Sequence, residues 1–222
     1  MEPVRVAFRA ECARLTGVLH ELDEADLDLP TDCPPWTVRE LIAHVRTGAG
    51  RLADMLAAPA PPRAEVDAAG YFGASKFTAP VDAERIAGGR RDARQVPSAA
   101  LPAEFERAWQ AADAAVAAAP PERVVRTRHG DAMRLTEFLR TRVVEVGVHG
   151  LDLAAALGRP PWLTPQAATV IGDLLTGGRP VPAGLRWDTL TLIRKTTGRL
   201  PPTPAEPAHI DAAGFRWLAF GS

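Results

Sequence analysis

The stretch RVVEVGVHGLDLAAALG, which runs from Arg142 to Gly158, decides the fold. Its apolar residues are nearly continuous, which is typical of a helix buried on all sides. Four ionisable residues are nevertheless set into it at intervals of three or four: Arg142, Glu145, His149 and Asp152. On a helix this spacing places them close to one face. Because a buried charge without a partner is costly, these groups must pair with one another, face a wet cleft or bind a metal.

The spacing of Glu145 and His149 is compatible with a metal site. The two residues are four apart, so their side chains can reach one ion from the same helix face. A catalytic zinc ion takes three protein ligands and keeps an open position. His44, in LIAHV on the apolar stripe of a second expected helix, is the candidate third ligand. A His-Glu-His set favours zinc, with nickel, manganese or iron as alternatives. The competing interpretation is that His44 is a core histidine with a carboxylate or carbonyl partner.

Three further long helices are expected around this one. Apolar residues step by three or four through residues 3–22. Thr37 and Glu40 form a capping box for a helix that continues to Ala57. Residues 102–118 form the third helix, with Pro102 in its first turn, and residues 134–157 form the fourth. The sequence therefore predicts an all-α protein built on a four-helix bundle.

The remaining segments are expected to be less regular. Residues 59–101 are rich in Pro, Gly and Ala, which predicts a long loop that Tyr71, Phe72 and Phe77 order into a cover. Residues 123–134 are expected to be a plain connector. After residue 160 we expect two short helices, which begin at Thr164 and Asp188, and an irregular tail. The tail ends in FRWLAF (215–220), expected to be a strand or a docking segment. These features divide the chain into a bundle over 1–160 and a mostly helical extension over 161–222, packed on or beside it.

Composition excludes several classes of function. The chain has 222 residues, 46% of them hydrophobic, and a formal net charge of −1, so nucleic acid and acidic membranes are not expected partners. No apolar run reaches the roughly 18 residues of a membrane span. The first residues lack the apolar core of a signal peptide, and Cys12 and Cys33 are interpreted as reduced thiols, so we expect a cytoplasmic protein. We expect it to be a monomer or a homodimer.

Several polar residues are expected to have no part in chemistry. Cys33 is interpreted as a small residue at a helix entrance, and His129 as a surface residue of the connector. Arg90, Arg91 and Arg94 are interpreted as a solvated face, with contact to a polar cofactor as the weaker alternative. Gly147 and Gly150 each cost about 1 kcal/mol in a helix relative to alanine, so we expect them to admit a neighbouring helix or a cofactor.

Two motifs resemble a known family. CPPWTVRELIAHV (33–45) and RVVEVGVHGLDLAAALG (142–158) resemble the motifs of the mycothiol-dependent maleylpyruvate isomerase N-terminal family, which is part of the DinB-like superfamily. The resemblance spans about residues 1–160, and YFGASKFTAPVDAERI and TGRLPPT resemble family segments more loosely. It implies a DinB-like four-helix bundle with a divalent metal held by His44, Glu145 and His149. It also implies the thiol mycothiol, whose sulfur approaches the open metal position.

The resemblance implies a metal-dependent transferase or isomerase. A zinc-bound thiol loses its proton at neutral pH, so we expect S-transfer from mycothiol to a small electrophile, or thiol-assisted isomerisation of it. Arg142 is the candidate catalytic residue: it would orient a substrate carboxylate, or support Glu145 or Asp152. The isomerases carry an α/β domain after the bundle, whereas residues 160–222 are short, proline-rich and strand-poor, which favours S-transfer. The alternatives are a thiol-independent biosynthetic enzyme on the same bundle and a non-catalytic, metal-binding stress-response bundle.

Overall fold

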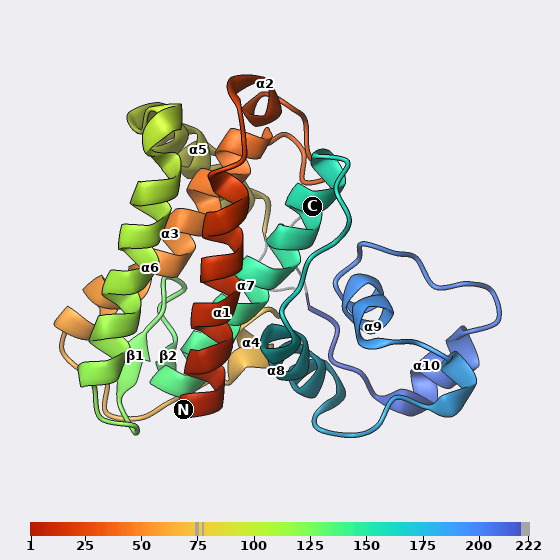
Figure 1. Cartoon of the computed structure of the whole chain (residues 1–222). Helices are drawn as coiled ribbons and strands as arrows, with labels where there is room; N and C mark the ends of the chain where they lie inside the picture. The colour runs from red at the N-terminus through yellow and green to blue at the C-terminus, as the bar shows by residue number, and fades with distance from the viewer. Residues whose placement is uncertain (74–75, 77, 219–222) are drawn as a thin grey trace.

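The computed structural model describes residues 1–73, 76 and 78–218. Four long helices lie side by side: α1 (Glu2–Leu19), α3 (Val38–Ala57), α6 (Leu101–Ala118) and α7 (Leu135–Ala156) (Figure 1). Each coincides, within a few residues at either end, with a helix expected from the sequence. The prediction of an all-α four-helix bundle is confirmed.

Side chains at the helix ends fix the boundaries that the sequence predicts. The Thr37 hydroxyl accepts a hydrogen bond from the Glu40 amide, and the Glu40 carboxylate accepts one from the Thr37 amide, which forms the expected capping box of α3. In the extension, Thr164 caps α8 (Pro165–Thr176) and Asp188 caps α9 (Thr189–Thr196).

No helix in the described ranges is both long and apolar enough to cross a bilayer.

Helix α7 is the centre of the molecule, packed against α1, α3 and α8. Its glycines allow the extension to approach closely. A Cβ at Gly147 would lie 2.9 Å from Ile171 Cδ1, and one at Gly150 would lie 3.0 Å from Trp162 Nε1. The expectation that these glycines admit a neighbouring helix is therefore confirmed, and the neighbour is α8 with the segment that precedes it.

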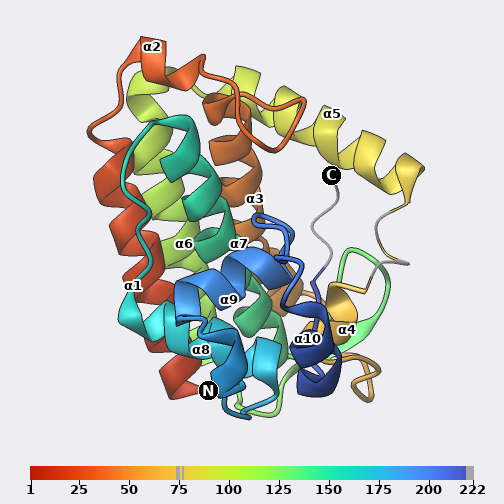
Figure 2. The same cartoon turned by 90° about the vertical axis from the view of Figure 1, so that its right-hand side faces the viewer.

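The prediction of a long loop over residues 59–101 was wrong. This region contains α4 (Ala68–Tyr71), α5 (Ala79–Gln95) and a short 3-10 turn at Ser98–Ala100. Helix α5 buries only Gly89 and Ala93, so it has no apolar stripe for the sequence to reveal. It packs on α3, and in Figure 2 it runs outward from the upper end of that helix. Phe77, expected to order this region, lies outside the described residues.

The connector and the tail are also more regular than expected. Strand β1 (Val124–Arg126) pairs antiparallel with β2 (Ala132–Arg134), with Val125 opposite Met133, so residues 123–134 form a hairpin. Two short helical segments, α2 (Glu24–Leu27) and the 3-10 turn Ala183–Leu185, complete the connections. Helix α10 (Pro207–Ala213) interrupts the tail. Residues 215–218 of FRWLAF form no strand, and 219–220 lie outside the described residues.

The extension packs on the bundle rather than standing apart from it. Helix α8 lies against α1 and α7, and α9 lies against α8 (Figure 1). One apolar cluster continues from the bundle residues into Ile171, Leu174 and Ile193 of the extension. The mostly helical extension is confirmed, whereas the domain boundary at residue 160 stays a prediction.

Candidate metal centre

The structure brings together the three residues that the sequence predicts as ligands. His44 Nε2 on α3 is 3.7 Å from Glu145 Oε2 on α7, and His149 Nε2 is 3.5 Å from the same oxygen. One ligand atom from each residue lies within 4.8 Å of the other two. The two imidazole rings are 5.4 Å apart and nearly perpendicular. Two imidazole nitrogens and a carboxylate oxygen form a donor set that suits zinc and related divalent ions.

Helix periodicity explains this convergence. Glu145 and His149 are one turn apart on α7, so they project from the same face. His44 lies on the face of α3 that packs against α7, and its ring lies 4.6 Å from the buried Trp36 ring. Trp36 immediately precedes the α3 capping box, so the start of the helix and the position of His44 are set by the same segment.

Asp152 holds His149 from the other side of its ring. His149 Nδ1 lies 2.9 Å from Asp152 Oδ2, which turns Nε2 toward Glu145. Arg199, which follows α9, donates to both Asp152 oxygens, over 3.0 Å to Oδ1 and 2.7 Å to Oδ2. The Cys33 thiol donates to Asp152 Oδ2 over 3.1 Å. A carboxylate behind a ligand histidine fixes the ring and its tautomer, so Asp152 is the orienting group of this site.

Arg142 is buried beside Glu145, one of the candidate ligands. Its Nη2 is 3.7 Å from Glu145 Oε1, and its guanidinium lies over the rings of Phe138 and Tyr71. A side chain at Gly48 would lie 3.2 Å from its Nη1, so the glycine leaves room for this group. Of the two carboxylates that Arg142 was expected to support, Glu145 is the one within ion-pair distance.

Burial and hydrogen bonding give the three candidate ligands different pKa values. Burial lowers the pKa of His44 to about 4. Burial opposes the ionisation of Glu145, but hydrogen bonds from His149 and His44 outweigh it and hold the Glu145 pKa well below its usual range. Burial also disfavours charge on His149, but its bonds to Asp152, Cys33 and Glu145 raise its pKa. A proton and a metal ion would therefore compete for His149.

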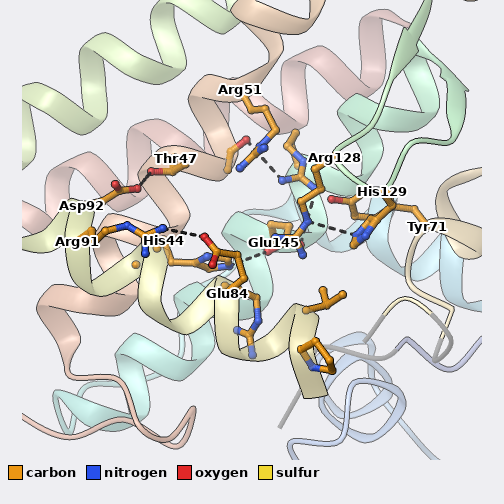
Figure 3. Close-up of a pocket in the computed structure, with 17 residues that line it drawn as sticks. His44, Thr47, Arg51, Tyr71, Glu84, Arg91, Asp92, Arg128, His129 and Glu145 are labelled. Atoms are coloured by element: carbon orange, nitrogen blue, oxygen red, sulfur yellow. Dashed lines mark hydrogen bonds and ion pairs between the residues drawn. The ribbon is translucent and has the colours of Figure 1, made fainter. Parts of the chain in front are cut away.

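A cavity of about 590 Å³ opens beside the candidate ligands. His44 and Glu145 line its floor, and α5 closes one side with Glu84 and Arg91, which form an ion pair of 2.8 Å (Figure 3). The interpretation of Arg91 as part of a solvated face was therefore incomplete. A cavity of this size next to a three-residue ligand set has room for a small molecule.

Cationic side chains dominate the far wall of this cavity. Arg51, Arg128 and His129 lie there (Figure 3), and Arg142 also lines the cavity. Within the described residues, no carboxylate lies at ion-pair distance from Arg51. Burial and the charges of Arg142 and Arg128 lower its pKa. His129, expected at the surface, lines the cavity and packs against Tyr71 at 5.3 Å. The cavity therefore combines a ligand set with excess positive charge, which suits an anionic small molecule.

Sequence reasoning missed Arg199, Arg51 and the role of Cys33. Cys33 was interpreted as a small residue at a helix entrance, but the structure groups it with His149 and Asp152. Both Cys33 and Arg199 come from irregular segments, where residue spacing does not predict the direction in which a side chain points. The available signals were the motifs CPPW and TGRLPPT, which contain Cys33 and Arg199.

The fold and the site define a helical bundle of the DinB-like type, with a potential metal-ligand group between two of its helices. The chain belongs to the mycothiol maleylpyruvate isomerase N-terminal domain family, whose model matches residues 8–154. Two crystal structures are similar, those of the mycothiol-dependent maleylpyruvate isomerase and of one of its histidine-to-alanine mutants. Each has a TM-score of 0.53 and 19% identity, with 79% of this chain and 69% of the other covered. This likeness supports the fold alone. No curated protein sequence gives a significant match.

Proposed function

We propose that this protein is a divalent-metal-dependent enzyme that uses mycothiol to modify or isomerise a small electrophile. The observation that carries the proposal is the convergence of His44, Glu145 and His149 at the floor of a cavity. Family membership supports the thiol, because the family is named for a mycothiol-dependent isomerase. The proposal includes zinc as the ion, the cytoplasm as the location, and a monomer or homodimer as the assembly.

The residues present fit such an ion. His44, Glu145 and His149 would hold it, and the bound ion would supply Lewis acidity that converts a thiol into a thiolate. A proton on His149 Nδ1, shared with Asp152, would leave Nε2 to bind the ion together with the other candidate ligands. Because Glu145 serves as a ligand, it is not the general base.

Arg142 is the proposed catalytic residue. It is buried, borders the cavity and lies beside Glu145, so it can orient the carboxylate of an electrophile next to the reacting centre. Arg51 and Arg128 add positive charge on the same wall. These cations favour an electrophile that carries a carboxylate.

Metal content and thiol dependence test the proposal. Purified protein should hold about one divalent ion per chain, and His149→Ala should lose it, as expected for a three-ligand site. His20→Ala, at an exposed position, is the matched control. Loaded protein should consume maleylpyruvate or a halogenated aromatic electrophile only when mycothiol is present. Wild-type protein without metal, and unchanged by His149→Ala, would refute the proposal. Turnover without any thiol would indicate the thiol-independent enzyme instead.

A further inference from the structure

Two potential ligand groups share the imidazole of His149. The first is the His44–Glu145–His149 group, toward which Nε2 points. The second consists of Cys33, His149 and Asp152, whose ligand atoms also lie within 4.8 Å of one another. Nδ1 serves this second group, since it lies 2.9 Å from Asp152 Oδ2. The same ring could therefore bind an ion on either side.

The chemistry of the donor atoms does not favour metal binding at the first group over the second. A thiolate, an imidazole and a carboxylate are as suitable for zinc as two imidazoles and a carboxylate. The second group is also compact, with Cys33 Sγ only 3.1 Å from Asp152 Oδ2. Asp152 and His149 are both buried, which would protect a bound ion from water. A further feature of the structure must therefore determine which of the two groups binds an ion.

Arg199 provides that feature. Its Nε and Nη2 donate to the two oxygens of Asp152, and Nη2 lies 3.8 Å from Cys33 Sγ. A bidentate guanidinium engages both carboxylate oxygens, which a metal would otherwise use. Because arginine stays charged at any physiological pH, it also repels a cation from this place. A hydrogen bond of 2.7 Å from Nη1 to the Thr197 carbonyl holds the side chain there.

We propose that Arg199 is a positioning residue that keeps metal off the Cys33–His149–Asp152 group and commits His149 Nε2 to His44 and Glu145. The inference rests on the proposed function in one respect, that the His44–Glu145–His149 group holds the ion. Arg199 lies outside residues 8–154, the segment that matches the family. The extension thereby determines which side of a bundle histidine is available to metal.

Cobalt(II) distinguishes the two groups, because a cysteine ligand adds a thiolate-to-cobalt charge-transfer band in the near ultraviolet. The full-length protein is stripped of metal, kept reduced with a phosphine and titrated with Co²⁺. Wild type should show d–d bands without the charge-transfer band. Arg199→Met should acquire that band, and a further Cys33→Ser change should abolish it. Arg199→Lys, which restores a cation, should largely suppress it. Arg194→Met, at an exposed position of α9, is the matched control and should behave as wild type.

Each outcome decides the inference. A folded Arg199→Met protein that binds Co²⁺ without the thiolate band overturns it, as does a thiolate band in the wild type. If the wild type binds no Co²⁺, the proposed function fails. In that case the band in Arg199→Met would still support the exclusion by Arg199, and its absence would overturn it. Arg199→Gln, whose amide can still donate to Asp152, replaces Arg199→Met if the latter does not fold.

Discussion

Four side chains of α7 have different positions and contacts in the candidate site. Glu145 and His149 are candidate ligands, Asp152 hydrogen-bonds the His149 ring, and Arg142 lines the cavity. All four lie on the face defined by their spacing of three and four. The spacing of these residues along one helix face therefore sets where an ion, the carboxylate behind its histidine ligand and a substrate would lie relative to one another.

His129 should make the metal-free protein sensitive to mild acid. Burial and the charges of Arg128 and Lys76 lower its pKa to about 4, below the ordinary value of 6.5. The unfolded chain therefore takes up a proton first, so stability is lost as pH falls from about 6.5 toward 4. His129→Gln removes this contribution. Its melting temperature should fall less between pH 7 and pH 5 than that of the wild type, as measured by circular dichroism. Parallel pH profiles for the two proteins would contradict the assignment.

Arg51 should contribute to the binding of anionic small molecules. It lines the cavity with Arg128 and Arg142, and losing a charge-assisted hydrogen bond costs about 1.5–3 kcal/mol, roughly 10- to 100-fold in affinity. Maleate is a suitable probe, measured by calorimetry on metal-free and zinc-loaded protein. Arg51→Gln should weaken binding of maleate in both forms, whereas Arg126→Gln, on the exposed face of β1, should not. Equal affinity of both variants for maleate would show that the cavity does not use Arg51.

Helix periodicity made the convergence of the candidate ligands predictable, whereas the neighbouring residues Cys33 and Arg199 lie outside regular helices. His44, Glu145 and His149 project from regular helices, so their faces follow from sequence number. Arg199 follows α9 in a turn, and Cys33 lies in a proline-rich segment before α3. The direction of a side chain in such a segment depends on tertiary contacts, which a single sequence does not reveal.

Among the elements, α5 shows why the loop prediction failed. A surface helix is recognised by its apolar stripe, but α5 buries only Gly89 and Ala93 and presents charged residues elsewhere. It is held to α3 by polar contacts, which include Thr47 to Asp92 at 2.8 Å and Arg90 to Glu40 at 3.3 Å. Polar packing of this kind leaves no periodic signal in the sequence.

Close packing of α7 and α8 should make Gly147 intolerant of a side chain. Gly147→Ala places a methyl group 2.9 Å from Ile171 Cδ1 and 3.0 Å from Leu163 Cδ1. Gly17→Ala, on α1, meets nothing within 4 Å and is the matched control, because both changes gain the same helix propensity of about 1 kcal/mol. The difference between them isolates the packing cost, expected at about 1–3 kcal/mol by urea unfolding. Equal unfolding free energies would mean that the ends of the Ile171 and Leu163 side chains move aside at little cost.

At the scale of the whole molecule, the extension and the bundle share one core and one buried ion pair. Apolar residues of α8 and α9 continue the bundle core, and Glu11 on α1 accepts hydrogen bonds from the amide and hydroxyl of Thr164. Arg199 and Asp152 join the two parts at the candidate site itself. We therefore expect the whole chain to unfold as one cooperative unit.

Breaking the Arg199–Asp152 pair should destabilise the entire metal-free protein. Asp152 is 3% exposed, so Arg199→Gln takes the bidentate guanidinium away from a buried carboxylate that keeps His149 and Cys33 as its charged and thiol partners, which costs about 1–3 kcal/mol. For a chain of this size, each kcal/mol corresponds to about 2–4 °C in melting temperature. The loss should be equal by circular dichroism and by tryptophan fluorescence, because Trp162 and Trp187 report on the extension and Trp109 on the bundle. Arg194→Gln, exposed on α9, should change stability by no more than about 0.5 kcal/mol. Separate transitions for the two probes would show that the extension unfolds on its own, and that the ion pair stabilises only the extension's attachment to the bundle.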